Sequence, residues 1–311
     1  MKVLIAGGAG DVGRYLAHDF LSMGHQVKIL DRAANAFKAE KNLPIGYVQG
    51  DLADQAIVNE AVRDSEVVIN LAWSFADDPH TIFSEDVQGH INLMEAASPS
   101  GIKHFIYTST ATVYGRAISH PVTETHPCLT EEARKPLYAL GKWTAEELCR
   151  YYYKERGLPV TIFHFWWAFG ENIGGSHLRD LIRKSFNHQP LEMVRGAGGT
   201  FLTMADLGNA VISAIKHPSS SGQVYNLGSL FLTWEEIGKM MVELTHSNST
   251  IHLVASDEWQ GPAFLNEVWD LSREKAEREL GYKPKDTLES MRSLFLHALR
   301  SCIRQISPAH H

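Results

Sequence analysis

The sequence is poor in cysteine and has no long apolar run, and both absences narrow the classes of protein that it can encode. Only three cysteines occur among 311 residues, at Cys128, Cys149 and Cys302, and none forms a CxxC pair. This odd, widely spaced set predicts free thiols in a reducing compartment. No apolar stretch approaches the roughly 20 residues that a spanning helix needs. The chain enters a strand-like segment at once, without a signal peptide, so we expect a soluble cytoplasmic protein with no membrane partner.

An excess of positive charge is also missing. Lysine and arginine number 29 against 36 aspartates and glutamates, giving a net charge of -7. This balance argues against a nucleic-acid partner. The sixteen histidines show no HExxH-type spacing with acidic support, so no metal is expected. The length and a 44% hydrophobic content predict one large α/β domain, or a core domain with a smaller lobe.

Short apolar segments alternate with segments of helical periodicity through the first half of the chain. The sequence predicts strands at residues 3–6, 27–30, 46–49, 67–71, 105–108 and 160–163. It predicts helices at residues 11–23, 55–63, 84–97 and 137–156. This alternation is typical of a Rossmann-type, doubly wound parallel sheet.

After about Phe165 the rhythm changes, and glycine-rich loops with aromatic residues appear. A helix at 205–216 and a strand at 223–227 are expected to return to the main sheet. Thr233, with Glu236 three residues on, predicts a capped helix through residue 244, and a further helix is expected at 271–280. We therefore assign residues 1–165 and 202–228 to the Rossmann domain. Residues 166–201 and 229–311 would form a smaller, mostly helical lobe.

A glycine loop follows the first predicted strand and precedes a helix. Gly7, Gly10 and Gly13 form GxxGxxG, with Asp11 and Val12 between the last two, and Gly8 adds an overlapping GxGxxG. Such a loop lets the backbone approach a pyrophosphate, whose charge is favoured by the helix N-terminus. The position after the first strand predicts dinucleotide binding.

Asp31 ends the second predicted strand, 18 residues after Gly13. An acid there can bind the adenosine ribose hydroxyls and repels a 2′-phosphate, so NAD is expected rather than NADP. The neighbouring Arg32 keeps NADP as the alternative. Further cofactor contacts are expected at the ends of the following strands, from Asp51, Leu52, Leu71, Ala72 and Trp73.

Tyr138 and Lys142 stand one helical turn apart, beyond a strand that ends at Thr110. A tyrosine phenol has a pKa near 10, and a nearby ammonium would stabilise the phenolate. Tyr138 could then take a proton from a substrate alcohol or return it to a carbonyl. Thr110 could hydrogen-bond the reacting oxygen, and Lys142 could also bind the nicotinamide ribose.

These motifs resemble those of the extended short-chain dehydrogenase/reductases, and within them the NAD-dependent epimerase/dehydratase family. The resemblance rests on the segments 7–13, 107–115, 138–142, 201–210, 224–228 and 270–284. It implies that Thr110, Tyr138 and Lys142 are the catalytic residues of a Rossmann domain with a small substrate lobe. Thr108, Phe165 and Trp166 would join the cofactor contacts. A homodimer through the helices at 84–97 and 137–156 is also implied.

The departures from the family pattern concern the substrate. Ala111-Thr112 stand where the dehydratases carry Asp-Glu, which disfavours water elimination. Trp167 replaces a small asparagine, and Glu171 replaces a proline. Gly199 stands near the place of an arginine that clamps a diphosphate in relatives that act on nucleotide sugars. Candidate substrate contacts are Ser74, Thr110, Trp167, His177, Arg179 and Arg195.

The leading hypothesis is an NAD-dependent oxidoreductase or epimerase that acts on a secondary alcohol or ketone of a sugar-like or small polyhydroxy molecule. A nucleotide-sugar 4-epimerase is the alternative within enzymes. A non-catalytic NAD-binding regulator is the alternative from another class, although such proteins commonly lose the Tyr–Lys pair that this chain keeps.

Overall fold

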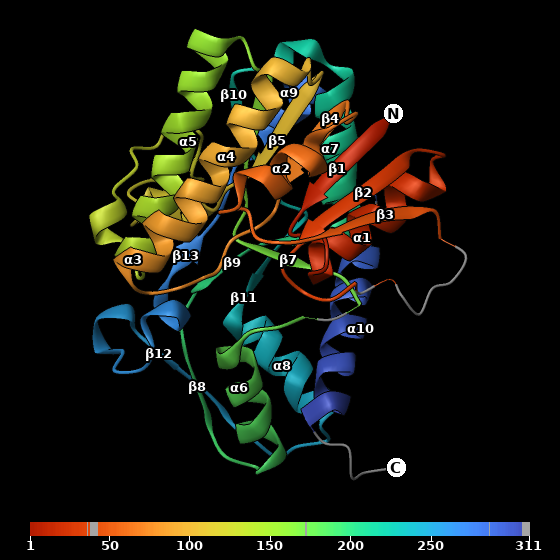
Figure 1. Ribbon diagram of the computed structural model, residues 1–311. Coiled ribbons are helices and arrows are strands. Elements are labelled where there is room, and N and C mark those ends of the chain that lie inside the picture. Colours follow the sequence, from red (N-terminus) through yellow and green to blue (C-terminus); the bar gives the residue numbers. More distant parts are fainter. Residues whose placement is uncertain (36, 38–42, 172, 286, 307–311) are drawn as a thin grey trace.

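A parallel seven-stranded sheet forms the centre of the computed structural model (Figure 1). The structure describes residues 1–35, 37, 43–171, 173–285 and 287–306. The strand order is β10-β6-β5-β4-β1-β2-β3, and every neighbouring pair is parallel. The strands are β1 (Lys2–Ala6), β2 (Gln26–Asp31), β3 (Ile45–Gln49), β4 (Val67–Asn70), β5 (His104–Thr108), β6 (Val160–His164) and β10 (Gln223–Asn226). The Rossmann-type fold predicted from the sequence is thereby confirmed.

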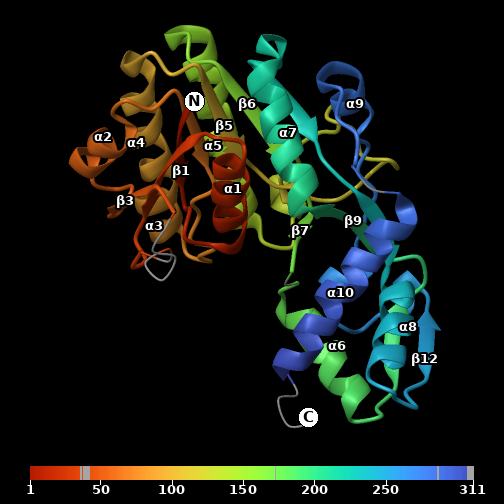
Figure 2. The same ribbon diagram turned by 90° about the vertical axis from the view of Figure 1, so that its right-hand side faces the viewer.

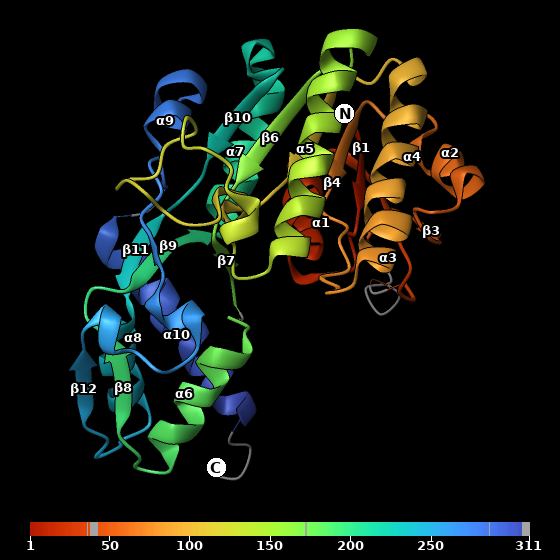
Figure 3. The same ribbon diagram turned by 90° about the vertical axis from the view of Figure 1, so that its left-hand side faces the viewer.

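Helices cover both faces of this sheet (Figure 3). On one face pack α1 (Asp11–Ser22), α7 (Met204–Lys216) and α9 (Glu274–Leu280). On the other pack α2 (Gln55–Val62), α4 (Gln88–Ala97) and α5 (Pro136–Arg156). Every residue of β4, β5 and β6 is buried, which explains why these segments are almost continuously apolar in sequence.

The segment between β4 and α4 differs from the expected single helix at 84–97. A short α3 (Pro79–Thr81) leads into a π-helical turn, η1 (Ile82–Val87), and α4 begins only at Gln88. Asp78 caps the start, its side chain accepting a hydrogen bond from the Thr81 amide. π-Helical turns frequently occur at functional sites. Here the turn carries two acidic residues, Glu85 and Asp86, to the edge of the sheet.

The rest of the chain forms a lobe below the carboxyl edge of the sheet (Figure 2). It contains α6 (Ser176–Phe186), α8 (Trp234–Leu244) and α10 (Leu288–Ile306). Two small sheets accompany these helices. One pairs β8 (Leu191–Val194) with β12 (Ile251–Val254); the other joins β7 (Trp167–Phe169), β9 (Gly198–Thr203), β11 (Leu230–Thr233) and β13 (Val268–Trp269).

The helix expected at 271–280 is shorter than predicted, because Leu271 lies in an isolated bridge with Val122 and α9 begins at Glu274. The capping box at Thr233 and Glu236 is present. Within the described residues, no helix is long and apolar enough to cross a membrane. The division of the chain between a cofactor domain and a substrate lobe stays a prediction.

Candidate active site

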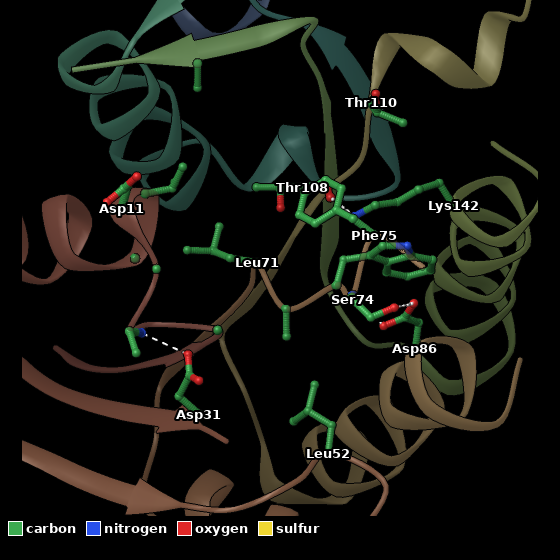
Figure 4. Close-up of a pocket in the computed structure, with 18 of the residues that line it drawn as sticks. Asp11, Asp31, Leu52, Leu71, Ser74, Phe75, Asp86, Thr108, Thr110 and Lys142 are labelled. Carbon is green, nitrogen blue, oxygen red and sulfur yellow. Dashed lines mark hydrogen bonds between the residues drawn. The ribbon is translucent and has the colours of Figure 1, made fainter. Parts of the chain in front are cut away.

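A cavity of about 890 Å³ lies at the carboxyl ends of the sheet strands, where ligands bind in open α/β sheets. Its lining includes the predicted cofactor contacts Gly7, Gly10, Asp11, Val12, Gly13, Asp31, Arg32, Asp51, Leu52, Leu71, Ala72, Trp73, Thr108, Tyr138, Lys142, Phe165 and Trp166. Of the predicted substrate contacts, Ser74, Thr110 and Trp167 also line it. Figure 4 shows part of this wall.

The glycine loop brings the backbone close to the neighbouring strand end. Gly7 has φ +77°, and a Cβ there would lie 2.7 Å from the backbone nitrogen of Ala72. α1 then begins at Asp11, with Gly10 as its N-cap and no side-chain cap. Those amides carry the positive end of the helix dipole and suit a phosphate group. The loop therefore fits the pyrophosphate of a dinucleotide.

Asp31 reaches from the end of β2 toward the glycine loop (Figure 4). One carboxylate oxygen accepts a hydrogen bond from the Ala9 amide and the other from the Ala33 amide, both at 2.9 Å. These bonds fix the carboxylate at the wall of the cavity, where it suits ribose hydroxyls.

Arg32 is held by acidic side chains from other elements. Its Nη1 lies 2.8 Å from Oε2 of Glu85 and 3.5 Å from Oδ2 of Asp51. An arginine at this place is the group that would accommodate a 2′-phosphate. Its two carboxylate partners therefore reinforce the preference for NAD that Asp31 sets.

Tyr138 lies in the first turn of α5, half-buried. Burial raises the pKa of its phenol, and the charge of Asp86 acts in the same direction. Hydrogen bonding by Thr110 and the charge of Arg134 lower the pKa, but by less. The protein's own groups thus keep the phenol protonated at neutral pH.

Lys142 is buried one turn further along α5. Its Nζ donates to the carbonyl oxygen of Thr108 at 3.0 Å and lies 4.2 Å from the centre of the Trp73 ring. Burial lowers the pKa of Lys142 to about 7, although the charges of Asp86 and Glu146 oppose the shift. That this ammonium stabilises the phenolate stays a prediction. In the structure the long side chain reaches across to the end of β5.

Thr110 is the N-cap of a short 3₁₀ helix, η3 (Ala111–Tyr114). Its hydroxyl accepts from the Thr112 amide at 3.2 Å and donates to the Thr112 hydroxyl at 3.0 Å. These bonds hold the Thr110 hydroxyl at the cavity wall beside Tyr138, where it suits a substrate oxygen.

Three predicted substrate contacts do not reach the main cavity. His177 stacks on Phe264 with ring centroids 5.1 Å apart and lines a separate cavity of about 370 Å³. Arg179 donates to the Gln305 side chain on α10 at 3.4 Å. Arg195 is exposed in the turn after β8. Sequence position did not show which way these side chains point.

Trp166 and Trp167 line the cavity and also pack against the hydrophobic core of the lobe. Trp166 stacks on Phe264, with centroids 5.4 Å apart and an interplanar angle of 22°. Trp167 contacts Phe201 at 5.5 Å. A Cβ at Gly199 would collide with the six-membered ring of Trp166. The indole thus fills the space that a side chain at position 199 would need.

Several wall residues were missed by sequence reasoning. Phe75 follows Ser74 in the loop after β4, while Glu85 and Asp86 come from the π-helical turn. Other missed lining residues are Ala9, Leu30, Ala33, Gly50, Ser109, Ala168, Gly174, Gly175 and Met204. The sequence predicted cavity residues mainly at the ends of strands. Glu85 and Asp86 lie on the helical turn η1 instead, so that pattern could not find them. Among the described residues, no three His, Cys, Asp or Glu side chains form a group that could hold a metal ion.

The glycine loop, the acid at the end of β2 and the Tyr–Lys pair on α5 together define an enzyme of the extended short-chain dehydrogenase/reductase type. The chain belongs to the NAD dependent epimerase/dehydratase family, whose family model matches residues 3–228. This membership confirms the family predicted from the sequence and agrees with NAD as the expected cofactor.

Relatives of this family are similar to between 72% and 98% of the chain. The UDP-glucose 4-epimerase of Lactobacillus helveticus is 24% identical, covering 92% of each protein. An N-acetyl-alpha-D-glucosaminyl-diphospho-ditrans,octacis-undecaprenol 4-epimerase of Escherichia coli O157:H7 is 31% identical, over 72% of this chain and 66% of that protein. The structure of UDP-glucuronic acid 4-epimerase from Bacillus cereus, in complex with UDP-glucuronic acid and NAD, superposes with a TM-score of 0.79 at 22% identity. It covers 98% of this chain and 100% of that one.

Proposed function

We propose that this protein transfers hydride between NAD and a secondary alcohol or ketone of a sugar-like molecule, with Tyr138 as acid and base. One observation carries the proposal: Tyr138, Thr110 and Lys142 line the same cavity as the glycine loop and Asp31. Hydride chemistry needs a proton donor or acceptor beside the dinucleotide, and this arrangement supplies one.

Each residue of the catalytic group has a separate task. Thr110 holds the reacting oxygen, and Tyr138 exchanges a proton with it. Lys142 places its amino group at the end of β5, beside the position expected for the nicotinamide ribose. NAD, when bound, supplies the hydride chemistry and a positive ring, and that ring would favour the phenolate that the protein alone disfavours.

The substrate is proposed to be smaller than a nucleotide sugar. Relatives named for UDP-sugars share the fold, but here Trp166 occupies the space beside Gly199, where the resemblance would place an arginine for the diphosphate. The aromatic packing of Trp166 on Phe264 and of Trp167 on Phe201 supports a shortened substrate site.

A nucleotide-sugar 4-epimerase is the second candidate, because several relatives bear that name. The two functions predict different fates for the hydride. An epimerase returns it to the substrate, so NADH does not accumulate. A dehydrogenase releases NADH in proportion to the substrate consumed.

The test is a panel of free hexoses, their uronic acids and the matching UDP-sugars. NADH absorbance and sugar composition are both followed. Steady NADH formation with a free sugar or sugar acid supports the proposal. Interconversion of UDP-sugars without NADH supports the 4-epimerase instead, and it would refute the smaller substrate.

A homodimer and a cytoplasmic location stay predictions. The exposed apolar side chains of Leu140 and Tyr151, eleven residues apart and so on one face of α5, support an association through this helix.

A further inference from the structure

Phe75 combines two unusual properties at the wall of the active-site cavity. Its backbone is left-handed, with φ +57°, a conformation that costs a bulky residue free energy. Its side chain is large and apolar, yet the residue is 67% exposed. Neither the left-handed backbone nor the exposure of an apolar side chain stabilises the fold. We therefore looked for a role of Phe75 in function.

A specific set of hydrogen bonds holds this turn in place. The Ser74 amide donates to one oxygen of Asp86 at 2.8 Å, and the Ser74 hydroxyl donates to the other at 2.6 Å. The Ala76 amide donates in turn to the Ser74 hydroxyl at 3.2 Å. Figure 4 shows Ser74 and Asp86 joined in this way beneath Phe75 and Lys142. Ser74, predicted as a substrate contact, thus builds the turn that carries Phe75.

The turn places Phe75 directly over the catalytic tyrosine. The two rings are nearly parallel, with an interplanar angle of 15° and centroids 5.6 Å apart. Trp73 meets the same Tyr138 ring edge-on at 6.4 Å. Phe75 and Trp73 both line the cavity, so Phe75 presents an exposed apolar surface within reach of a molecule bound at Tyr138.

We propose that Phe75 is a substrate-binding residue that packs on the apolar C–H face of a pyranose-sized ring whose secondary alcohol meets Tyr138. The proposal rests on the proposed function and adds the chemistry of one wall of its substrate site. A polyhydroxy ring offers an apolar face as well as hydroxyl edges, and an aromatic ring complements that face. The cost of the left-handed turn is consistent with a residue kept for binding.

Phe75→Gly separates binding from folding, because glycine adopts φ +57° without strain. If Phe75 serves the substrate, relief of the left-handed strain largely offsets the lost contact with Tyr138, and the melting temperature stays close to that of the wild type. Its kcat/KM for the best free sugar or uronic acid of the panel falls about tenfold, mainly through KM, as expected for one lost aromatic contact. NAD binding stays unchanged in Phe75→Gly. The separate variant Phe75→Tyr keeps the aromatic ring and should retain most of the wild-type activity. Phe83→Ala, on a partly exposed phenylalanine outside the cavity wall, is the matched control and leaves KM unchanged.

The outcomes distinguish this inference from the function on which it rests. If Tyr138→Phe abolishes turnover while Phe75→Gly keeps the wild-type KM, the inference is overturned and the proposed function stands. A fall in stability of Phe75→Gly with unchanged KM also overturns it, since Phe75 is then structural. If the wild type neither binds nor converts any sugar of the panel, both fail.

Discussion

The ammonium of Lys142 is bonded to the carbonyl oxygen of Thr108, at 3.0 Å, across the gap between α5 and β5. A strand end thereby fixes the position of the only cation that the catalytic group contains. The bond also explains why Lys142 can be buried, because the carbonyl and the Trp73 ring replace part of its hydration.

Burial of Lys142 makes stability depend on pH. Its pKa falls to about 7 in the folded protein, against about 10.4 in an unfolded chain. Between these values the unfolded state binds the extra proton, so the contribution of Lys142 to stability rises with pH. Relative to Lys142→Met, the wild type should gain at most about 1.4 kcal/mol per pH unit from pH ~7 to ~10. Denaturant unfolding at several pH values measures this, and identical slopes for the two proteins would contradict it.

Glu85 is expected to suppress the use of NADP by holding Arg32 at 2.8 Å. Glu85→Gln should raise the ratio of kcat/KM for NADP to that for NAD about twofold to fivefold, the modest size expected of an exposed ion pair. NAD stays preferred because Asp31 is intact. Glu132→Gln, which breaks an exposed pair with Arg116 outside the cavity lining, is the control. An unchanged ratio in Glu85→Gln would show that Arg32 plays no part in cofactor choice.

Gly199 and Trp166 are expected to be energetically coupled. Gly199→Ala forces a Cβ into the indole and should lower the free energy of unfolding by about 1–3 kcal/mol. Trp166→Leu should relieve that penalty, so the double variant is more stable than the two separate losses predict. Gly174→Ala meets open space and serves as control. Additive losses in the double-mutant cycle would argue that the indole does not fill this space.

The sequence predicted the parts of the site that depend on strand ends. Glycine spacing and the acid after β2 are backbone features, so their positions follow from the order of strands and helices. The direction of a long side chain does not follow from the order of strands and helices. The sequence therefore did not predict that Arg179 contacts α10 or that Lys142 donates to the Thr108 carbonyl. The sequence predicted a single helix from residue 84, so the π-helical turn was missed, and with it the place of Asp86, the anchor of the Phe75 turn.

The most direct test of the account is single-turnover NADH formation by the wild type and by Tyr138→Phe, with the best free sugar or sugar acid of the panel. The substitution removes only the phenol oxygen and keeps the ring between Phe75 and Trp73. We expect hydride transfer to slow at least ~10²-fold, the contribution of a general base, while the Kd for NAD stays within a factor of about two. An undiminished rate in Tyr138→Phe would contradict the account, because another group would then be the base.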